Sequence, residues 1–170
     1  MKIFTIGHST RTINQFIKIL LLNKIRILVD VRGYPGSRTV PQFNKDSLKK
    51  SLAKYKIEYI HIPELGGRRK LVSHLDTSIE SPGFKSYAQY MRRNEFKIGL
   101  ANLKRIARKR KTAIMCAEAV WWSCHRRMIS DRLTFDNWQV YHLGVGSEPK
   151  LHEIWNIARW DSDNGIVYDG

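Results

Sequence analysis

Hydrophobic residues recur along the chain in two alternating patterns. Short, nearly continuous apolar runs predict five buried strands, over residues 2–6, 25–31, 57–62, 112–116 and 139–143. Apolar residues at helical spacing predict helices between them, over residues 12–23, 46–54, 84–92, 95–110 and 124–133. The first helix begins with the spacing of a capping box, Thr12 followed by Gln15. Strands that alternate with helices in this way are typical of an α/β fold.

The connecting segments differ in length and polarity. Residues 32–44 and 64–82 carry glycines, prolines and charges, and we expect both to be loops. The tail, residues 144–170, has a weaker pattern that favours one helix over 152–160. No repeat or linker divides the chain, so we expect one α/β domain over residues 1–170, with the tail as a C-terminal extension. Right-handed crossovers predict a three-layer, Rossmann-like, mostly parallel sheet of about five strands with helices on both faces.

The balance of charge is strongly positive. The 170 residues include 30 Lys and Arg but only 15 Asp and Glu, which gives a formal net charge of +15 at pH 7. Because self-repulsion of this size destabilises a compact state, a polyanionic partner is a natural explanation. We therefore expect nucleic acid as the partner, DNA rather than RNA. A generally Lys-rich surface is the alternative.

Cysteine content and hydropathy indicate the compartment. Two cysteines cannot form a disulfide framework, so a reducing, cytoplasmic environment is expected. The N-terminal residues lead into the first strand without an apolar signal core, and the apolar run at residues 19–22 is too short to cross a bilayer. We expect no membrane association. We also expect no cofactor, since Gly66-Gly67 alone is too weak a phosphate-binding signal.

Reactive or ionisable side chains follow every predicted strand. In a parallel sheet the carboxyl ends of the strands share one edge, where the ligands of open α/β sheets bind. The candidates for catalysis at this edge are His8, Asp30, Arg32, Cys116 and Glu118. His8 follows Gly7, which lets a ligand or a backbone approach closely. Asp30 has a structural alternative, a buried ion pair with Arg32.

The turn after the fourth strand concentrates the most chemistry. It contains both cysteines, a carboxylate, an imidazole, two guanidinium groups and two adjacent tryptophans. Three interpretations of Cys116 stay open: a thiolate nucleophile, a small buried residue, or, least favoured, a metal ligand with Cys124 and His125. No metal is expected, because the two cysteines lack the short paired spacing of structural zinc sites. Glu118 is either a general base or a partner of Arg126.

Further side chains at the same edge are candidates for substrate binding. They are Ser9, Arg11, Arg38, His61, Glu64, Arg68, Arg69, Trp121, Trp122, His125 and Arg126. Arginine side chains would bind phosphate, and the two tryptophans could stack on an unpaired base. The alternatives are structural: His61 or His142 as a hydrogen-bonded core or turn residue, and one tryptophan packed under the following helix.

Several motifs, in order, give the chain a resemblance to a known family. They are Gly7-His8-Ser9, Asp30-Val31-Arg32, Pro35 with Ser37-Arg38, Gln42-Phe43-Asn44, Tyr59-Ile60-His61-Ile62-Pro63-Glu64-Leu65-Gly66-Gly67, and Cys116-Ala117-Glu118 with Cys124-His125-Arg126. Over residues 3–143 the chain resembles the prokaryotic family catalogued as domain of unknown function 488. That family has been proposed to belong to the rhodanese-phosphatase superfamily, with suggested roles in nucleic-acid repair or modification. The resemblance implies a rhodanese-like sheet with the Cys116 turn at the nucleophile position.

The same turn departs from a phosphatase loop. A phosphatase loop has an Arg a few residues after its Cys, whereas the sixth position after Cys116 is Trp122 and the first Arg is Arg126. The bulky residues of the turn also disfavour a nest of backbone N–H groups. We therefore do not expect a compact phosphate cradle, nor phosphatase or thiosulfate sulfurtransferase activity.

Three hypotheses for the function follow. The favoured one is a nucleic-acid-associated enzyme of base repair or modification, using hydrolytic or thiol chemistry in a basic cleft. The second is cysteine-dependent sulfur or phosphoryl transfer on a small anionic substrate. The third is a non-catalytic DNA- or RNA-binding protein, which would tolerate replacement of Cys116 and Glu118.

Overall fold

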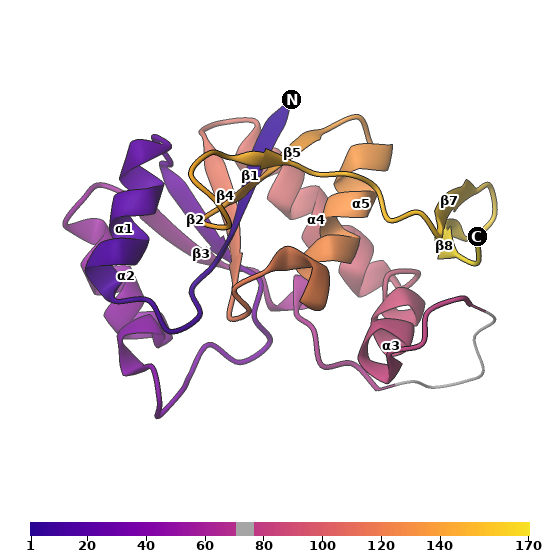
Figure 1. Cartoon of the computed structure of the whole chain (residues 1–170), viewed down its shortest axis with the longest axis horizontal. Coiled ribbons are helices and arrows are strands. Elements are labelled where there is room, and N and C mark those ends of the chain that lie inside the picture. The colour runs from indigo at the N-terminus through magenta and orange to yellow at the C-terminus, as the bar shows by residue number, and fades with distance from the viewer. Residues whose placement is uncertain (71–76) are drawn as a thin grey trace.

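A central β-sheet lies between two layers of helices (Figure 1) in the computed structural model, which describes residues 1–70 and 77–170. The sheet has six strands in the order β3-β2-β4-β1-β5-β6. They are β1 (Lys2–Gly7), β2 (Ile27–Asp30), β3 (Glu58–His61), β4 (Thr112–Cys116), β5 (Gln139–Leu143) and β6 (Lys150–Leu151). The first five are parallel, and β6 pairs antiparallel with β5. The predicted α/β class with a mostly parallel sheet is confirmed.

Helices cover both faces of this sheet. They are α1 (Ile13–Leu22), α2 (Lys45–Ala53), α3 (Pro82–Tyr90), α4 (Asn94–Ala107) and α5 (Arg126–Phe135). In Figure 1, α1 and α2 lie on the left face, α4 and α5 lie on the right face, and α3 lies below those two. Thr12 and Gln15 exchange both hydrogen bonds of the predicted capping box at the start of α1.

The hydrophobic core forms one layer on each side of the sheet, because successive strand residues point to opposite faces. Leu28 of β2 packs in the layer that contains Phe16 of α1. Its neighbour Val29 packs in the layer that contains Leu103 of α4. Burial on both faces explains why β2 reads as a continuous apolar run rather than an alternating one.

The tail differs from its prediction. The helix expected over 152–160 is wrong, because β7 (Ala158–Asp161) and β8 (Gly165–Tyr168) pair there as an antiparallel hairpin. The Asp161 carboxylate accepts backbone N–H bonds at its turn, and Gly165 adopts a φ of +75°. This local turn chemistry outweighs the weak helical spacing. The sheet also exceeds the expected five strands, because the two-residue β6 is too short to leave a pattern.

Short 3-10 helices lie within the segments predicted as loops. They are η1 (Pro41–Phe43), η2 (Pro63–Leu65) and η3 (Trp121–Ser123). Proline at the first position of η1 and η2 presets the backbone angle that such a turn needs. Part of the loop predicted over 64–82, residues 71–76, lies outside the described residues. Because of η3, α5 begins at Arg126 rather than at residue 124.

The parallel strands run from the N-terminal side of the sheet, at the top of Figure 1, to a carboxyl edge in the lower part. Backbone hydrogen bonds extend the strand pairing just beyond the strands: His8 N–H donates to the Cys116 carbonyl and Val31 N–H to the Met115 carbonyl, both at 3.0 Å. The first residues of the loops after β1, β2 and β4 are therefore held side by side at this edge.

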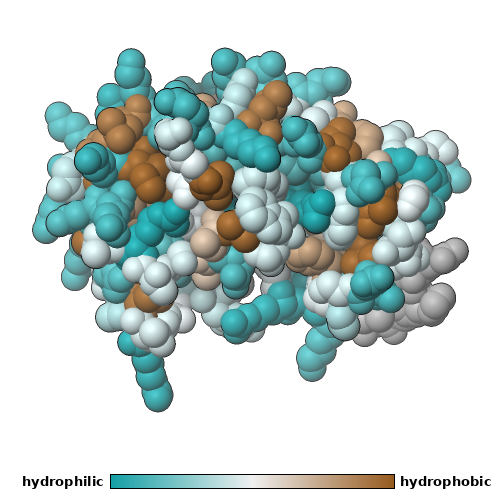
Figure 2. Space-filling view, viewed as in Figure 1, coloured by the Kyte–Doolittle hydropathy of each residue, from teal (hydrophilic) through white to brown (hydrophobic). Residues whose placement is uncertain are grey.

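The helices of the described residues were compared with the length and hydropathy of a membrane span. None of their helices is both long enough and apolar enough to span a bilayer. Figure 2 shows hydrophilic residues over most of the visible face, with apolar residues in small, separate patches.

Candidate active site at the carboxyl edge of the sheet

A hollow of about 500 Å³, here called the edge pocket, opens at the carboxyl edge of the sheet. Its walls come from the loops after β1, β2 and β4, from residues 67–68 and from the start of α3. Six of the candidates predicted from the sequence line it: His8, Arg32, Arg68, Cys116, Glu118 and His125. Side chains that are far apart in the sequence therefore converge on one pocket, but the candidates from the ends of β3 and β5, His61 and His142, do not line it.

Arg32 is fixed in the pocket wall by a buried ion pair. Its Nη2 lies 2.7 Å from Asp30 Oδ2, and its Nε lies 2.9 Å from Asp30 Oδ1. The Tyr59 hydroxyl donates to the same carboxylate at 2.6 Å. Burial acts to lower the pKa of Arg32, but the hydrogen bond and the charge of Asp30 raise it. Asp30 is fully buried and does not line the pocket, so its carboxylate serves to hold Arg32.

His8 lies next to Arg32 with a defined tautomer. Its Nδ1 is 2.9 Å from the carbonyl of Ser9, which can only accept, so Nδ1 carries the proton. Its Nε2 then accepts from Arg32 Nη1 at 3.2 Å. The ring stacks on Phe43, with centroids 4.3 Å apart. Burial lowers the pKa of His8 and the Arg32 charge lowers it further, so His8 is neutral at pH 7.

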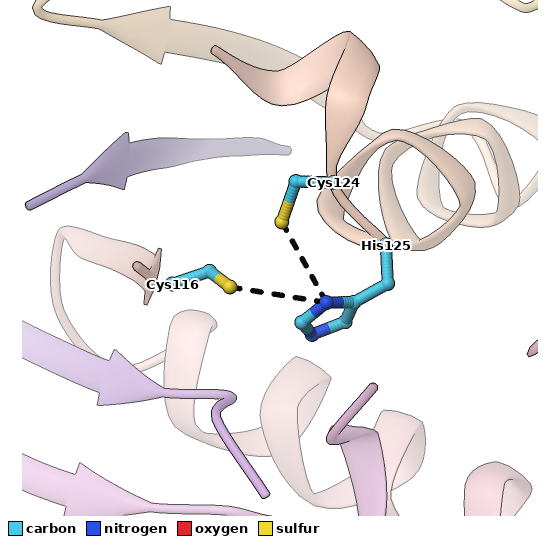
Figure 3. Close-up of side chains that lie close together, drawn as sticks. All are labelled: Cys116, Cys124 and His125. Atoms are coloured by element: carbon cyan, nitrogen blue, oxygen red, sulfur yellow. Dashed lines mark hydrogen bonds between the residues drawn. The ribbon is translucent and has the colours of Figure 1, made fainter. Parts of the chain in front are cut away.

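Cys116, Cys124 and His125 form a compact group on the pocket wall, here called the edge cluster (Figure 3). His125 Nδ1 lies 3.8 Å from Cys116 Sγ and 3.6 Å from Cys124 Sγ. Their ligand-type atoms all lie within 4.8 Å of one another. His125 Nε2 donates to the Val31 carbonyl at 3.0 Å, which leaves the lone pair of Nδ1 facing both sulfur atoms.

The two thiols of the edge cluster are electrostatically unequal. The hydrogen bond with Cys124, together with burial, raises the pKa of the Cys116 thiol. Burial would also raise the pKa of Cys124, but the hydrogen bond from Cys116 and the nearby His125 and Arg126 lower it below its ordinary value. The pKa of Cys124 therefore lies below that of Cys116, although the sequence indicates Cys124 only as a possible metal ligand.

Glycines make this close packing possible at two positions. A Cβ on Gly7 would lie 1.7 Å from the Glu118 carbonyl oxygen, so only glycine lets the β1 and β4 loops meet. A Cβ on Gly67 would lie 2.9 Å from His125 Nδ1. Gly67 therefore leaves the space that the imidazole of the edge cluster occupies.

Arg126 and Glu118 do not form the ion pair that the sequence left open. Arg126 is 1% exposed, and its Nη2 donates to the backbone carbonyl of Glu118 at 2.5 Å. Among the described residues, no carboxylate pairs with its guanidinium. Arg126 thus cannot reach a bound phosphate from this position, whereas the exposed Glu118 side chain remains available at the pocket.

Several other predicted binding residues hold the loops rather than line the pocket. Arg11 donates to the carbonyls of Gly7 and Gly144, and Arg69 donates to those of Gly66 and Pro63. His61 Nε2 donates to the Arg32 carbonyl at 2.8 Å. Three further candidates do not line the edge pocket: Ser9, Arg38 and Glu64.

A second hollow of about 280 Å³, here called the aromatic pocket, lies on the other side of η3. It is lined by Trp121, Trp122, Arg127, Lys150, Glu153, Ile154, Trp155 and Asn156. The Arg127 guanidinium lies 3.7 Å from the Trp155 ring centre, and Lys150 Nζ lies 5.4 Å from that of Trp121. Trp121 is largely buried against His142, whereas Trp122 is 48% exposed.

A buried histidine chain lies behind the aromatic pocket. Asp131 Oδ1 accepts from His152 Nε2 at 2.8 Å, and His152 Nδ1 accepts from His142 Nε2 at 2.9 Å. Thr5 then donates to His142 Nδ1 at 2.7 Å. Burial, with the charges of its neighbours, lowers the pKa of His142 to about 2. None of these four residues lines either pocket, and Trp121, which lines the aromatic pocket, stacks on the ring of His142.

Three residues of these sites are missed by the sequence pattern, for identifiable reasons. Cys124 is distant from Cys116 in sequence, and only the bend of η3 brings the two together. Tyr59 occupies an ordinary strand position, and its bond to Asp30 depends on the β2–β3 pairing. Trp155 lies in the tail, where the hydrophobic pattern is weakest.

Comparison with known proteins gives one match. A family model described as "Domain of unknown function DUF488" matches residues 12–133, most of the chain. This range includes the edge cluster, Asp30, Arg32 and Glu118, but neither β5 nor the tail. No curated protein and no solved structure matches the chain.

Proposed function

Because the chain belongs to the family of domain of unknown function DUF488, whose description states no activity, we propose a function from the site itself. The protein is an enzyme that binds nucleic acid and repairs or modifies it in the edge pocket. One observation carries the proposal: a single short turn, η3 with the two residues after it, lines both pockets. Trp121 and Trp122 face the aromatic pocket, whereas Ser123, Cys124 and His125 face the edge pocket.

This arrangement suits a nucleotide strand that crosses the turn. Stacking on an exposed aromatic ring contributes about 1–3 kcal/mol per base and tolerates any base. Trp122 is available for such stacking, and Arg127 and Lys150 stand beside it to meet phosphate. A base or phosphate on the other side of η3 would then lie against the reactive side chains of the edge pocket. The net charge of +15 favours the same class of partner.

Within the edge pocket, we assign roles by exposure and partners. Glu118 is exposed, and within residues 1–70 and 77–170 no basic side chain forms an ion pair with it, so it can activate a water molecule as general base. Arg32 is held rigidly by Asp30 and can stabilise developing negative charge without reorganisation. The neutral imidazole of His8 accepts a hydrogen bond from Arg32 Nη1, the guanidinium nitrogen that Asp30 does not hold. We therefore propose hydrolytic chemistry, with Asp30 and His8 as positioning residues.

A thiol mechanism is the second candidate, and the contact of His125 Nδ1 with two cysteines favours it. In that version the edge cluster would carry the nucleophile, on nucleic acid or on a small anionic sulfur or phosphoryl substrate. On the resemblance alone we also propose that the sheet is rhodanese-like, with the Cys116 turn at the nucleophile position. Full activity in both Cys116→Ser and Cys124→Ser variants would eliminate this candidate.

The proposed activity is tested with a panel of damaged and undamaged DNA and RNA oligonucleotides, analysed by mass spectrometry for altered bases and strand breaks. We expect one class of substrate to change with the wild-type protein and not with Glu118→Gln. If binding occurs but no oligonucleotide changes, the non-catalytic binding hypothesis replaces the enzyme.

Binding is tested separately with a matched pair of tryptophans. Trp122 is 48% exposed at the aromatic pocket, and Trp160 is 49% exposed on β7. Trp122→Ala should weaken binding of single-stranded oligonucleotides by roughly tenfold or more, because one stacking contact is lost. Trp160→Ala should leave binding unchanged. Equal effects from the two variants would contradict the proposed path.

A further inference from the structure

We infer that the edge cluster is a zinc-binding site in which Cys116, Cys124 and His125 supply three ligands. This inference is independent of the proposed activity on nucleic acid, because it concerns metal binding by the protein alone. It reverses the ranking from the sequence, where the separation of the two cysteines made a metal the least favoured interpretation. Among the described residues, this group is the one that gathers three potential metal ligands at such short range.

The two nitrogen-to-sulfur separations within the cluster fit a tetrahedral ion. Zinc bonds of ~2.3 Å to sulfur and ~2.0 Å to nitrogen, at tetrahedral angles, place S and N about 3.6 Å apart. The observed distances from His125 Nδ1 are 3.6 Å to Cys124 Sγ and 3.8 Å to Cys116 Sγ. The Nδ1 lone pair can accept only one proton, so a hydrogen bond to Nδ1 leaves the second sulfur atom without a bond to that nitrogen. A cation shared by the three atoms would bond to Nδ1 and to both sulfur atoms.

The surroundings of the cluster also match those of metal ligands. A ligating histidine usually donates its other ring N–H to a carbonyl or carboxylate, and His125 Nε2 donates to the Val31 carbonyl. The backbone N–H of Arg126 points to Cys124 Sγ at 3.5 Å, which stabilises a bound thiolate. Both cysteines are buried, and Gly67 keeps the imidazole from being displaced. Two thiolates would neutralise the charge of the ion.

The position of the cluster indicates the kind of zinc site. Structural zinc sites are closed by four protein ligands, whereas catalytic sites have three and leave one position for water or substrate. The described residues supply three ligands here, and all three line the edge pocket. The fourth position therefore faces the space where a substrate would bind, and a water molecule held there would be acidified by the ion.

Metal content and cobalt spectroscopy test the inference on the wild-type protein. Purified under reducing conditions, the chain should carry about one zinc per molecule. After removal of the zinc, titration with Co²⁺ alone should produce an intense thiolate-to-cobalt absorption band and the visible bands of a tetrahedral ion, saturating at one equivalent. Neither measurement requires a variant to fold, and neither depends on any enzymatic activity.

Variants locate the site. Cys124→Ser and His125→Gln should each weaken zinc binding more than the 10–100-fold that loss of an outer-shell partner costs. Ser123→Ala, which changes a neighbour that also lines the pocket, should bind zinc as the wild type does. Reduced wild-type protein that binds neither zinc nor cobalt would overturn the inference. Stoichiometric cobalt binding without a thiolate band, or unchanged in Cys124→Ser, would overturn it as well.

Discussion

The edge cluster and the histidine chain use similar side chains and differ in access. Each contains a histidine whose tautomer is fixed by a hydrogen bond, through the Val31 carbonyl in one case and through Asp131 in the other. The edge cluster lines a pocket of about 500 Å³. The ring of His142 is instead covered by Trp121, with centroids 4.0 Å apart and planes within 6°. Ionisable groups at a strand end therefore become reactive only where the fold leaves space beside them.

The histidine chain and the edge cluster also differ in whether their polar atoms already have partners inside the protein. In the histidine chain every polar atom between Asp131 and Thr5 has a partner inside the protein, so the chain can stabilise the fold. In the edge cluster two sulfur atoms lie beside one imidazole nitrogen, which leaves bonding capacity for an external ligand. We expect substitutions in the histidine chain to change the free energy of unfolding, and substitutions in the edge pocket to change function.

The largest effect on stability is expected for Asp131→Ala. The fully buried carboxylate accepts from His152, from the Trp155 backbone N–H and from the Tyr168 hydroxyl. Its loss leaves three buried donors unsatisfied, at about 1–3 kcal/mol each, so the free energy of unfolding should fall by roughly 3 kcal/mol or more. Chemical denaturation measures this. The exposed control Asp163→Ala should change it by less than about 0.5 kcal/mol. A loss of less than about 1 kcal/mol in Asp131→Ala would show that the histidine chain does not stabilise the fold.

The second effect is a dependence of stability on pH. The pKa of His142 is about 2 in the folded protein and 6.5 ordinarily, so the unfolded chain binds a proton more readily. The contribution of His142 to stability is complete above pH 6.5 and is lost as the pH falls toward 2. Each pH unit below 6.5 should cost about 1.4 kcal/mol, or roughly 2 kcal/mol at pH 5.

Denaturation of the wild type and of His142→Gln at pH 7, 6 and 5 checks this dependence. The variant is less stable at pH 7, and its curve should be flatter, because it lacks the group that titrates. The lowered pKa of His8 acts in the same direction in both proteins and cancels in the comparison. Parallel curves would show that His142 does not supply the dependence.

A smaller effect on stability, but a specific one on the edge cluster, is expected for Gly67→Ala. The new Cβ would lie 2.9 Å from His125 Nδ1, and overpacking of this kind costs about 1–3 kcal/mol. Displacement of the imidazole should also weaken the thiolate–cobalt band. Gly36 lines the same pocket but has nothing within 4 Å of an added Cβ, so Gly36→Ala is the matched control. Equal stability and an equal thiolate–cobalt band in the two variants would contradict the close packing of Gly67 against His125.

The smallest effect on stability is expected for Glu118→Gln. Its side chain is exposed, so the free energy of unfolding should change by less than about 0.5 kcal/mol. Activity on the responsive oligonucleotide should instead fall by about 10²–10⁴-fold, the usual contribution of a general base. Glu148→Gln, another exposed glutamate, should retain full activity. Full activity in Glu118→Gln would show that Glu118 is not the general base.

Part of this organisation could be predicted from the sequence, since it depends on local pattern. β4 and β5 have the predicted bounds, because their apolar runs are short. The convergence of His8, Arg32, Cys116 and Glu118 follows from parallel strands sharing one edge.

The rest depended on long-range packing that no local pattern encodes. His142 alternates along β5 like any strand residue, and its burial depends on His152 from the tail. Cys124 joins Cys116 only because η3 bends the chain back over the pocket. Arg126, expected to bind substrate, is buried because Gly7 allows the Glu118 loop to close over it. Side-chain direction and loop closure decided each of these cases.

The claim that the two pockets form one nucleic-acid-binding surface is tested most directly by hydrogen–deuterium exchange with and without a single-stranded oligonucleotide. We predict slower exchange in residues 116–127 and 32–38, with no change in residues 158–168 of the β7–β8 hairpin. Protection confined to the basic end of α4, around residues 104–111, with none beside η3, would contradict it.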